Sequence, residues 1–288
     1  LVSCEDKASD IPEYILPAYY DIYASWDPDG SRIVFVKSPS IKKVVRAEGI
    51  SCFYLNDSNV VDVVTEDSPY SYNIYQSTCF SPDGEWIAFS KNRNIYKIKA
   101  NGDSLAQLTF TDWNLEPDWS PSGELIAYSN NGGDDRGIYL LDIVTLEYRL
   151  IQRYSARPVW FPDGERLLVA TYIYGSTSEM IIIDTAGNVI TRLQEDGHGI
   201  SYNGDVSPDG NLICFGMLYP GKQPELWLVN ADGSDLHQLT TESGDMPAFS
   251  PDGEWIVYTH TANRDGSLFA IRPDGTDNHR LTDFNSED

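Results

Sequence analysis

Three polar residues, Glu116, Arg157 and Asn203, have side chains that could bind an ion or a charged ligand. They occupy the same position in a repeating pattern, just before the slot that Pro117 and Pro158 fill in their own copies. Carboxylate and amide oxygens are ligands that calcium prefers, so Glu116 and Asn203 could hold Ca²⁺. Arg157 falls between them in the order of the pattern, and its fixed positive charge opposes a cation a few ångströms away.

Other chemical motifs are absent or incomplete. The chain contains no G-x-S-x-G nucleophile motif. The stretch GMLYPGKQ (216–223) resembles a phosphate-binding loop but lacks the hydroxyl residue that binds magnesium, and a strand follows it. His198 and His260 are too few for a histidine-centred metal site unless carboxylates join them. His237 and His279 share one position in two repeats and are expected on outer strands.

The segments that must position these residues repeat along the chain. FSPDGEWIAFS (80–90) and FSPDGEWIVYT (249–259) are nearly identical, and four further segments share their pattern. A looser element follows each copy, as in LWLVNADGSDLHQLT (226–240). Such self-similarity indicates a supersecondary unit that buries its apolar faces only against its neighbours. The turn glycines of the six copies are Gly30, Gly84, Gly123, Gly164, Gly210 and Gly253.

The Ser-Pro-Asp-Gly turn indicates a β-hairpin. Proline presets φ near −65°, serine can bond back to the backbone, and glycine takes the left-handed conformation that closes the turn. The flanking strands, such as Trp86-Ile87-Ala88-Phe89, are β-branched and aromatic, with a nearly continuous apolar character typical of sheets buried on both faces. No stretch sustains a helical period across twelve residues, so we expect almost no helix.

These patterns predict an all-β fold, a six-bladed β-propeller with four antiparallel strands per blade. We expect a tether or edge segment at 1–20, then a propeller over 21–288 whose ring closes by packing of the blades. The expected blades are about 22–68, 76–110, 115–152, 156–194, 202–241 and 245–283.

The turn W/F-S-P-D-G, an I-A-F strand, an I-Y strand and a D-G turn before Leu-Thr together resemble the repeat of the TolB-type propeller family. The resemblance covers about residues 22–283 and implies the fold and a place in the bacterial envelope. The α/β domain that precedes the propeller in TolB is not in this sequence, so we expect a role other than that of TolB itself. Similar repeats form the propeller of prolyl-oligopeptidase-like enzymes, whose hydrolase domain is also not in this sequence.

Composition narrows the partners. The chain has 288 residues, with 44 acidic and 20 basic side chains and a net charge of −24. This charge argues against nucleic acid and anionic membrane surfaces as partners. Many of the aspartates occupy expected turns, which explains them without a dedicated acidic face. No run of eighteen apolar residues occurs, so we expect no membrane span.

The four cysteines show no metal-binding spacing. Cys79 and Cys214 fall inside expected strands, where a free cysteine behaves as a small buried hydrophobe. Leu1-Val2-Ser3-Cys4 resembles a bacterial lipobox, which makes Cys4 a candidate for lipidation. We expect a periplasmic or extracellular protein, with a lipid anchor at Cys4 as one form of it.

Ligands of propellers bind at the mouth of the central channel, which the innermost strands and their loops surround. The aligned ring positions are Tyr23, Ser77, Glu116, Arg157, Asn203 and Met246. Asp245 lies one residue before its ring position, so alternation along the strand is expected to turn it away. The alternative for the polar ring residues is that they only satisfy backbone groups at strand edges.

The loops that enter the inner strands are polar and aromatic, and they bring Tyr70, Tyr72, Trp113, Tyr154 and His198 to one face. Aromatic and arginine side chains form the hot spots of protein interfaces, and aromatic rings also suit sugars. The alternative is that the rings merely cover the blade tops.

Two functions follow. The first is a non-catalytic envelope or secreted propeller, without a cofactor, that binds a protein, peptide or glycan partner on this face. The second is a calcium-dependent hydrolase, similar to six-bladed lactonases, with Glu116 and Asn203 as metal ligands. We expect binding and no catalysis. The expected contact residues are Tyr72, Trp113, Glu116, Tyr154, Arg157, His198 and Asn203.

Overall fold

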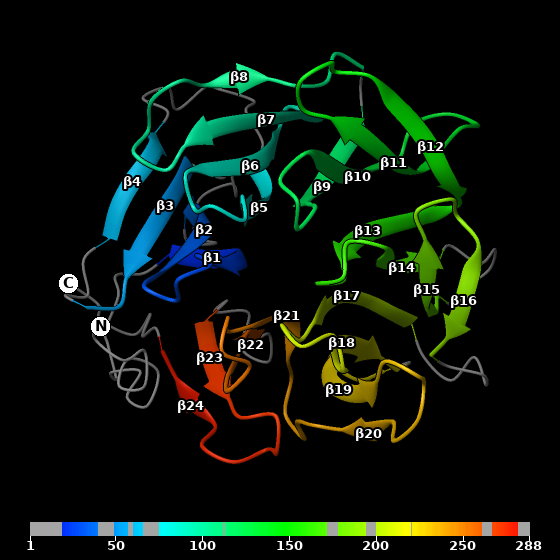
Figure 1. Ribbon diagram of the computed structural model, residues 1–288. Helices are drawn as coiled ribbons and strands as arrows, with labels where there is room; N and C mark the ends of the chain where they lie inside the picture. Colours follow the sequence, from blue (N-terminus) through cyan, green and yellow to red (C-terminus); the bar gives the residue numbers. More distant parts are fainter. Residues whose placement is uncertain are drawn as a thin grey trace, which may run out of the picture.

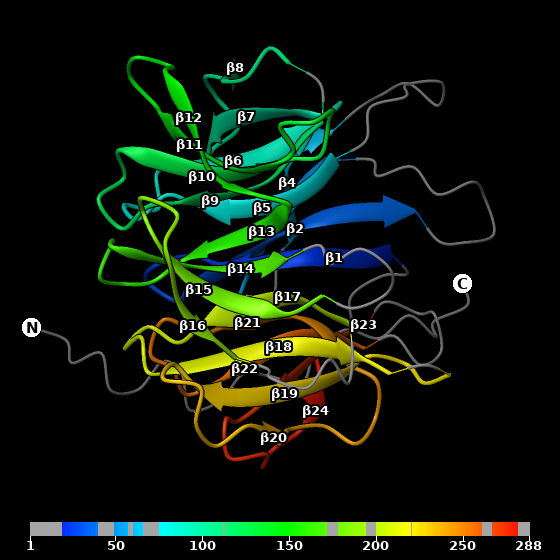
Figure 2. The same cartoon turned by 90° about the vertical axis from the view of Figure 1, so that its right-hand side faces the viewer.

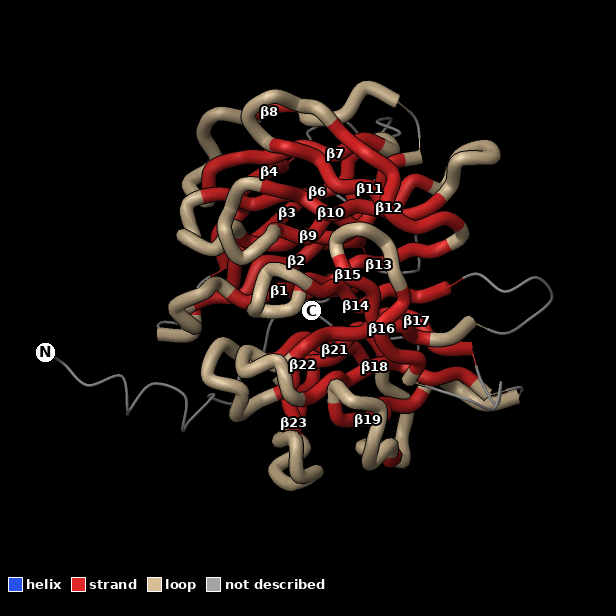
Figure 3. Tube along the Cα trace, turned by 45° about the vertical axis from the view of Figure 1, so that its right-hand side comes forward, coloured by secondary structure: helices blue, strands red, loops and turns tan. Residues whose placement is uncertain are grey.

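Six four-stranded antiparallel sheets stand in a ring around a central axis (Figure 1). The computed structural model describes residues 19–39, 49–56, 60–65, 75–111, 113–171, 178–193, 200–219, 221–260 and 267–281. Within these residues there is no helix, and Figure 3 shows strands joined by loops. The prediction of an all-β, six-bladed propeller is confirmed.

Each blade runs outward from the axis in chain order, so its first strand is the innermost one. The strands of the first three blades are β1 (Tyr19–Trp26), β2 (Arg32–Pro39), β3 (Gly49–Tyr54), β4 (Val60–Thr65), β5 (Tyr75–Phe80), β6 (Trp86–Lys91), β7 (Asn94–Lys99), β8 (Ala106–Gln107), β9 (Asn114–Trp119), β10 (Leu125–Asn130), β11 (Gly137–Asp142) and β12 (Tyr148–Arg153). Those of the last three are β13 (Ser155–Trp160), β14 (Arg166–Thr171), β15 (Met180–Asp184), β16 (Val189–Arg192), β17 (Ile200–Val206), β18 (Leu212–Leu218), β19 (Glu225–Asn230), β20 (His237–Gln238), β21 (Asp245–Phe249), β22 (Ile256–His260), β23 (Ser267–Ile271) and β24 (His279–Arg280). His237 and His279 lie on outer strands, as predicted.

The Ser-Pro-Asp-Gly turns have the expected geometry. Gly84 has a φ of +68° and donates its N–H to the carbonyl of Ser81 at 2.9 Å. The hydroxyl of Ser81 accepts the N–H of Trp86 at 2.9 Å, which starts β6. In the third blade Ser122 replaces the aspartate, and its hydroxyl still accepts the N–H of Glu124, at 3.3 Å. The small polar residue is therefore sufficient at this position.

The apolar core lies between the blades. One cluster joins Val34 and Ile50 of the first blade to Ile87 and Phe89 of the second. The second strand of the blades is buried on both faces, as in β6, β10, β14, β18 and β22, which explains its continuous apolar sequence. The cluster that contains Ile33 also contains residues of β22 and β23, so the sixth blade packs directly on the first. The ring closes by blade packing, as Figures 1 and 2 show.

The Ser-Pro-Asp-Gly turns also contact one another around the ring. A Cβ added at Gly253 would lie 3.3 Å from the ring of Pro208 in the preceding blade, and one added at Gly210 would lie 3.5 Å from Pro162. The same contact joins Gly30 to Pro251 across the closure, at 4.0 Å. The positive φ requires glycine at each of these turns, and at Gly253 the close approach of Pro208 adds to that requirement.

The innermost strands share a bulge that aims one residue at the axis. The pairing of β9 with β10 shifts register between the partners of Ala127 and Ser129, and the equivalent shift occurs on the other five inner strands. A bulge lets a strand re-aim a side chain. The ring residue takes a left-handed φ of +50° to +56° in five blades, at Ser77, Glu116, Arg157, Asn203 and Met246.

Candidate functional site

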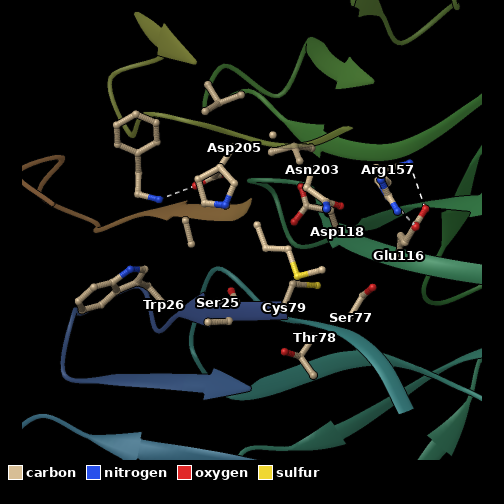
Figure 4. Close-up of a pocket in the computed structure, with 18 of the residues that line it drawn as sticks. Ser25, Trp26, Ser77, Thr78, Cys79, Glu116, Asp118, Arg157, Asn203 and Asp205 are labelled. Carbon is tan, nitrogen blue, oxygen red and sulfur yellow. Dashed lines mark hydrogen bonds and ion pairs between the residues drawn. The ribbon is translucent and has the colours of Figure 1, made fainter. Parts of the chain in front are cut away.

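A cavity of about 320 Å³ follows the propeller axis (Figure 4). Its walls come from the six inner strands and the Ser-Pro-Asp-Gly turns that follow them. The five described ring residues that face it are Ser77, Glu116, Arg157, Asn203 and Met246. The structure therefore brings the polar ring residues together, while the side chain of Tyr23 lies outside the described residues.

Glu116 and Arg157 form an ion pair across the boundary between two blades. Arg157 Nε donates to Glu116 Oε1 at 3.0 Å, and the backbone N–H of Arg157 donates to Oε2 at 3.2 Å. Ser129 donates its hydroxyl to the same Oε2 at 2.7 Å. Both carboxylate oxygens of Glu116 are therefore engaged by donors of the protein.

Asn203 is paired with Asp245 of the next blade. The amide Nδ2 of Asn203 lies 3.1 and 3.2 Å from the two carboxylate oxygens of Asp245, whose Oδ1 also accepts the N–H of Met246 at 2.8 Å. Burial raises the pKa of Asp245 to about 6, against the effect of the Asn203 hydrogen bond. Asp245 is not among the residues that line the cavity, which agrees with the expectation that it turns away, but its carboxylate holds the ring residue Asn203 from behind the channel wall.

The hydroxyl of Ser77 is a buried polar group that faces the same cavity. Ser77 is only 7% exposed, and its Oγ has no hydrogen-bond partner. A buried hydroxyl without a partner carries a desolvation cost that water or a ligand in the cavity would relieve. Among the described ring residues, the hydroxyl of Ser77 is therefore free to bind a ligand, whereas Glu116 is paired with Arg157 and Asn203 with Asp245.

Two further aspartates of the channel wall join neighbouring blades. Asp118 accepts the N–H of Trp160 at 2.7 Å, and Asp205 accepts that of Phe249 at 2.6 Å. Burial raises the pKa of Asp118 to about 7 and that of Asp205 to about 6. They occupy one aligned position, two residues after the ring residue, and this coincidence in the repeats could have identified them from the sequence.

On the loop face, where each outer strand leads to the next inner strand, Trp113 and Tyr154 are 43% and 41% exposed. Both have a left-handed φ, of +74° and +55°. The guanidinium of Arg93 stacks over the Trp113 ring at 3.8 Å, and that of Arg136 lies 5.8 Å from the Tyr154 ring. The sequence analysis missed these two arginines. Tyr70, Tyr72, His198 and Cys4, which it did select, lie outside the described residues.

Of the two residues proposed as calcium ligands, Glu116 has both oxygens engaged, while Asn203 is oriented by the hydrogen bonds of its amide nitrogen. Glu116 is held by Arg157 and Ser129, and Asn203 by Asp245. Among the described residues, no group of three or more His, Cys, Asp or Glu side chains could hold a metal ion. Cys52, Cys79 and Cys214 are buried free thiols, and burial raises the pKa of each. Nor does the described part of the chain contain a helix with the length and apolarity of a membrane span.

The six blades and their polar channel define a β-propeller of the six-bladed class. The PD40 family, described as the TolB beta propeller domain, matches residues 113–288. The chain belongs to this family.

Proteins that are similar in sequence to this chain differ in what their names say about function. The uncharacterized protein Atu1656 of Agrobacterium fabrum is 30% identical over 196 residues, which cover 64% of this chain and 65% of that protein. The uncharacterized peptidase YuxL of Bacillus subtilis is 28% identical over 204 residues, 62% of this chain but only 28% of that protein. Both relatives extend well beyond the matched part. A solved structure of a putative TolB from Agrobacterium tumefaciens shares the fold, with a TM-score of 0.67, 23% identity and coverage of 77% and 84%.

Proposed function

We propose that this chain is a non-catalytic binding propeller of the cell envelope, or a secreted one, that docks a protein, peptide or glycan on its loop face. The observation that carries the proposal is the pair of exposed aromatic side chains, Trp113 and Tyr154, each three residues before one member of the ion pair at the channel. Rigid aromatic rings and arginines supply most of the binding energy in protein interfaces.

The two ends of the propeller differ in how uniform their connections are, and this difference supports the proposal. The Ser-Pro-Asp-Gly turns repeat one another and pack together, so they serve the scaffold. The connections on the loop face differ in length and composition from blade to blade. Variable loops on a rigid scaffold are where binding residues concentrate.

The chemistry of the channel also favours binding over catalysis. Glu116 is neutralised by Arg157, and no pair of free carboxylates faces the cavity at the ring positions among the described residues. The proposed contact residues are Trp113, Glu116, Tyr154, Arg157 and Asn203, together with Tyr72 and His198. The family membership and the likeness to a putative TolB support a periplasmic or extracellular location, with Cys4 as a candidate lipid anchor.

The test is capture of a partner from envelope extract by immobilised protein. The double variant Trp113→Ala with Arg157→Ala should stay folded, with a melting temperature lowered by only about 2–4 °C through loss of the ion pair, and should lose most of the captured material. The matched control is Tyr148→Ala with Arg149→Ala, an exposed pair of the same types on the outer strand β12. Equal capture by both double variants would contradict the loop-face assignment, as would loss in the control alone.

A further inference from the structure

We propose that the loop face over the second, third and fourth blades recognises carboxylate groups of an acidic, extended peptide segment. This inference rests on the proposed function, since it names the chemistry of the partner. The residues that carry it are Arg93, Trp113, Arg136 and Tyr154, here called the arginine–aromatic surface.

The two arginines are placed by equivalent backbone contacts. Arg93 lies in the hairpin between β6 and β7, and its carbonyl accepts the N–H of Asn114 at 2.9 Å. Arg136 ends the hairpin between β10 and β11, and its carbonyl accepts the N–H of Tyr154 at 3.0 Å. The backbone of each arginine is thus fixed to the connection that leads into the next blade, near the aromatic ring that its guanidinium approaches.

The surface is continuous from one pair to the other. The carbonyl of Trp113 accepts the N–H of Asn131, and Gly132 packs against the indole so closely that a Cβ there would lie 3.1 Å from Cδ1. Residues 131–136 therefore connect the Trp113 pair to the Tyr154 pair. Arg153 secures the same hairpin by donating to the carbonyl of Asp134 at 2.9 Å and pairing with Asp135 at 2.6 Å.

Arg93 and Arg136 are exposed cations without an acidic partner in the described part of the chain. This is unusual in a chain with 44 acidic and 20 basic residues, where acids are available to pair with most arginines. Arg32, Arg157, Arg166 and Arg272, by contrast, all form ion pairs. Asp134 and Asp135 of the connecting segment lie beside these cations, but Asp135 is paired with Arg153, so the three arginines outnumber the two acids and the surface keeps a small positive excess that is complementary to an anionic partner.

The position of a guanidinium over an aromatic ring favours one kind of anion, the carboxylate. A guanidinium that lies flat on a ring keeps its N–H groups in its own plane, directed away from the ring and toward solvent. That arrangement suits the bidentate, planar contact that carboxylates make. Arg93 over Trp113 offers such a position, and Arg136, 5.8 Å from the Tyr154 ring, adds a second guanidinium on the next blade. The two together suit a segment with repeated Asp or Glu side chains, and the exposed rings give its backbone and apolar groups a place to pack.

The experiment measures fluorescence polarisation of a labelled peptide of alternating Asp and Ala at low ionic strength. We expect binding by the wild type that weakens with added salt. Arg93→Gln and Arg136→Gln should each weaken it by roughly fivefold or more, the range of charge-assisted pairs at partly solvated sites. Arg93→Lys should also weaken it, because lysine keeps the charge but loses the planar fork.

The matched control is Arg149→Gln, an exposed arginine on β12 away from this surface, which should bind like the wild type. Absence of binding by the wild type, or equal binding by all variants, would overturn the inference. Tighter binding of an oligogalacturonate with the same dependence on Arg93 would assign the surface to an acidic glycan instead. If Trp113→Ala with Arg157→Ala abolishes partner capture while Arg93 and Arg136 do not matter, the proposed function stands and this inference fails.

Discussion

The carboxylate of Glu116 accepts hydrogen bonds from both the side chain and the backbone of Arg157. One residue of the third blade therefore fixes the position of the inner strand β13 of the fourth blade. The side chains of Glu116 and Arg157 are 15% and 29% exposed, and both line the channel cavity. Removing one member of such a pair leaves the other partly buried without its counter-charge.

We therefore expect Glu116→Gln and Arg157→Met each to lower the free energy of unfolding by about 1 kcal/mol, a modest cost because solvent still screens the pair. The double variant should lose less than the sum of the two. Urea denaturation of all four proteins gives the coupling energy. Additive losses within experimental error would mean that the two side chains do not stabilise each other.

Gly84→Val and Gly253→Val should each cost about 1–2 kcal/mol or more, because a side chain is strained at the left-handed φ of +68° and +71°. The new Cβ would also lie 3.2 Å from a carboxylate oxygen of Asp27 or 3.3 Å from Pro208. Gly133, with a φ of +66° and open space around it, separates strain from crowding. If Gly133→Val costs as much as the other two, the contact between turns adds nothing.

Because of three aspartates in and beside the channel wall, we expect the free energy of unfolding to fall as the pH rises. Burial raises the pKa of Asp118 to about 7 and of Asp205 and Asp245 to about 6, from an ordinary value of 3.8. The folded state then binds protons more tightly than the unfolded state, so the stabilisation is present below pH 3.8 and is lost as the pH passes 6 to 7. Turn aspartates such as Asp83 have lowered pKa values and act in the opposite sense in stronger acid.

Urea midpoints of the wild type should accordingly be higher at pH 5 than at pH 8. Asp118→Asn with Asp205→Asn should flatten this slope, since the amide oxygens can still accept the N–H groups of Trp160 and Phe249. Asp83→Asn is the matched control on the turns. A wild-type midpoint that rises between pH 5 and 8, or a slope unchanged by the double substitution, would refute this prediction.

Calcium should leave the melting temperature of the wild type nearly unchanged. Both oxygens of Glu116 already accept hydrogen bonds, and Arg157 stands beside any cation that approached them. A ligand that binds only the folded state raises the melting temperature by mass action, so a thermal-shift titration with Ca²⁺ and then EDTA is decisive. A rise of several degrees that Glu116→Gln removes would favour the calcium-dependent hydrolase.

The fold could be predicted from the sequence because the same turn residues and apolar strand pattern recur in each blade. Proline, serine and glycine set each turn, and strands such as Trp86–Lys91 are apolar on both faces. The ring position was also predictable, since alignment on the turn glycine counts back to Glu116 and Arg157. The limit was the pairing of side chains between blades, because nothing in the spacing indicated that Asp245 would accept the Asn203 amide of the preceding blade.

The arginine–aromatic surface was beyond prediction for a different reason. Arg93 and Trp113 are separated by two strands, β7 and β8, and their stacking depends on how a hairpin of one blade meets the connection to the next. Sequence spacing identified Trp113 and Tyr154 as aromatic residues of the loop face. It carried no information about which cations would cover them.

Because of the left-handed bulge, the residues that face the channel can be substituted without a change in the fold. The backbone takes the same conformation whether the residue is Ser77, Glu116, Arg157, Asn203 or Met246, at a strain on the order of 1 kcal/mol in each blade. Since the turns and the interblade cores impose that conformation, a substitution there changes what the axis presents without altering the framework. A propeller of this kind can acquire a new specificity one blade at a time, and its descendants can diverge in ligand while remaining superimposable in fold.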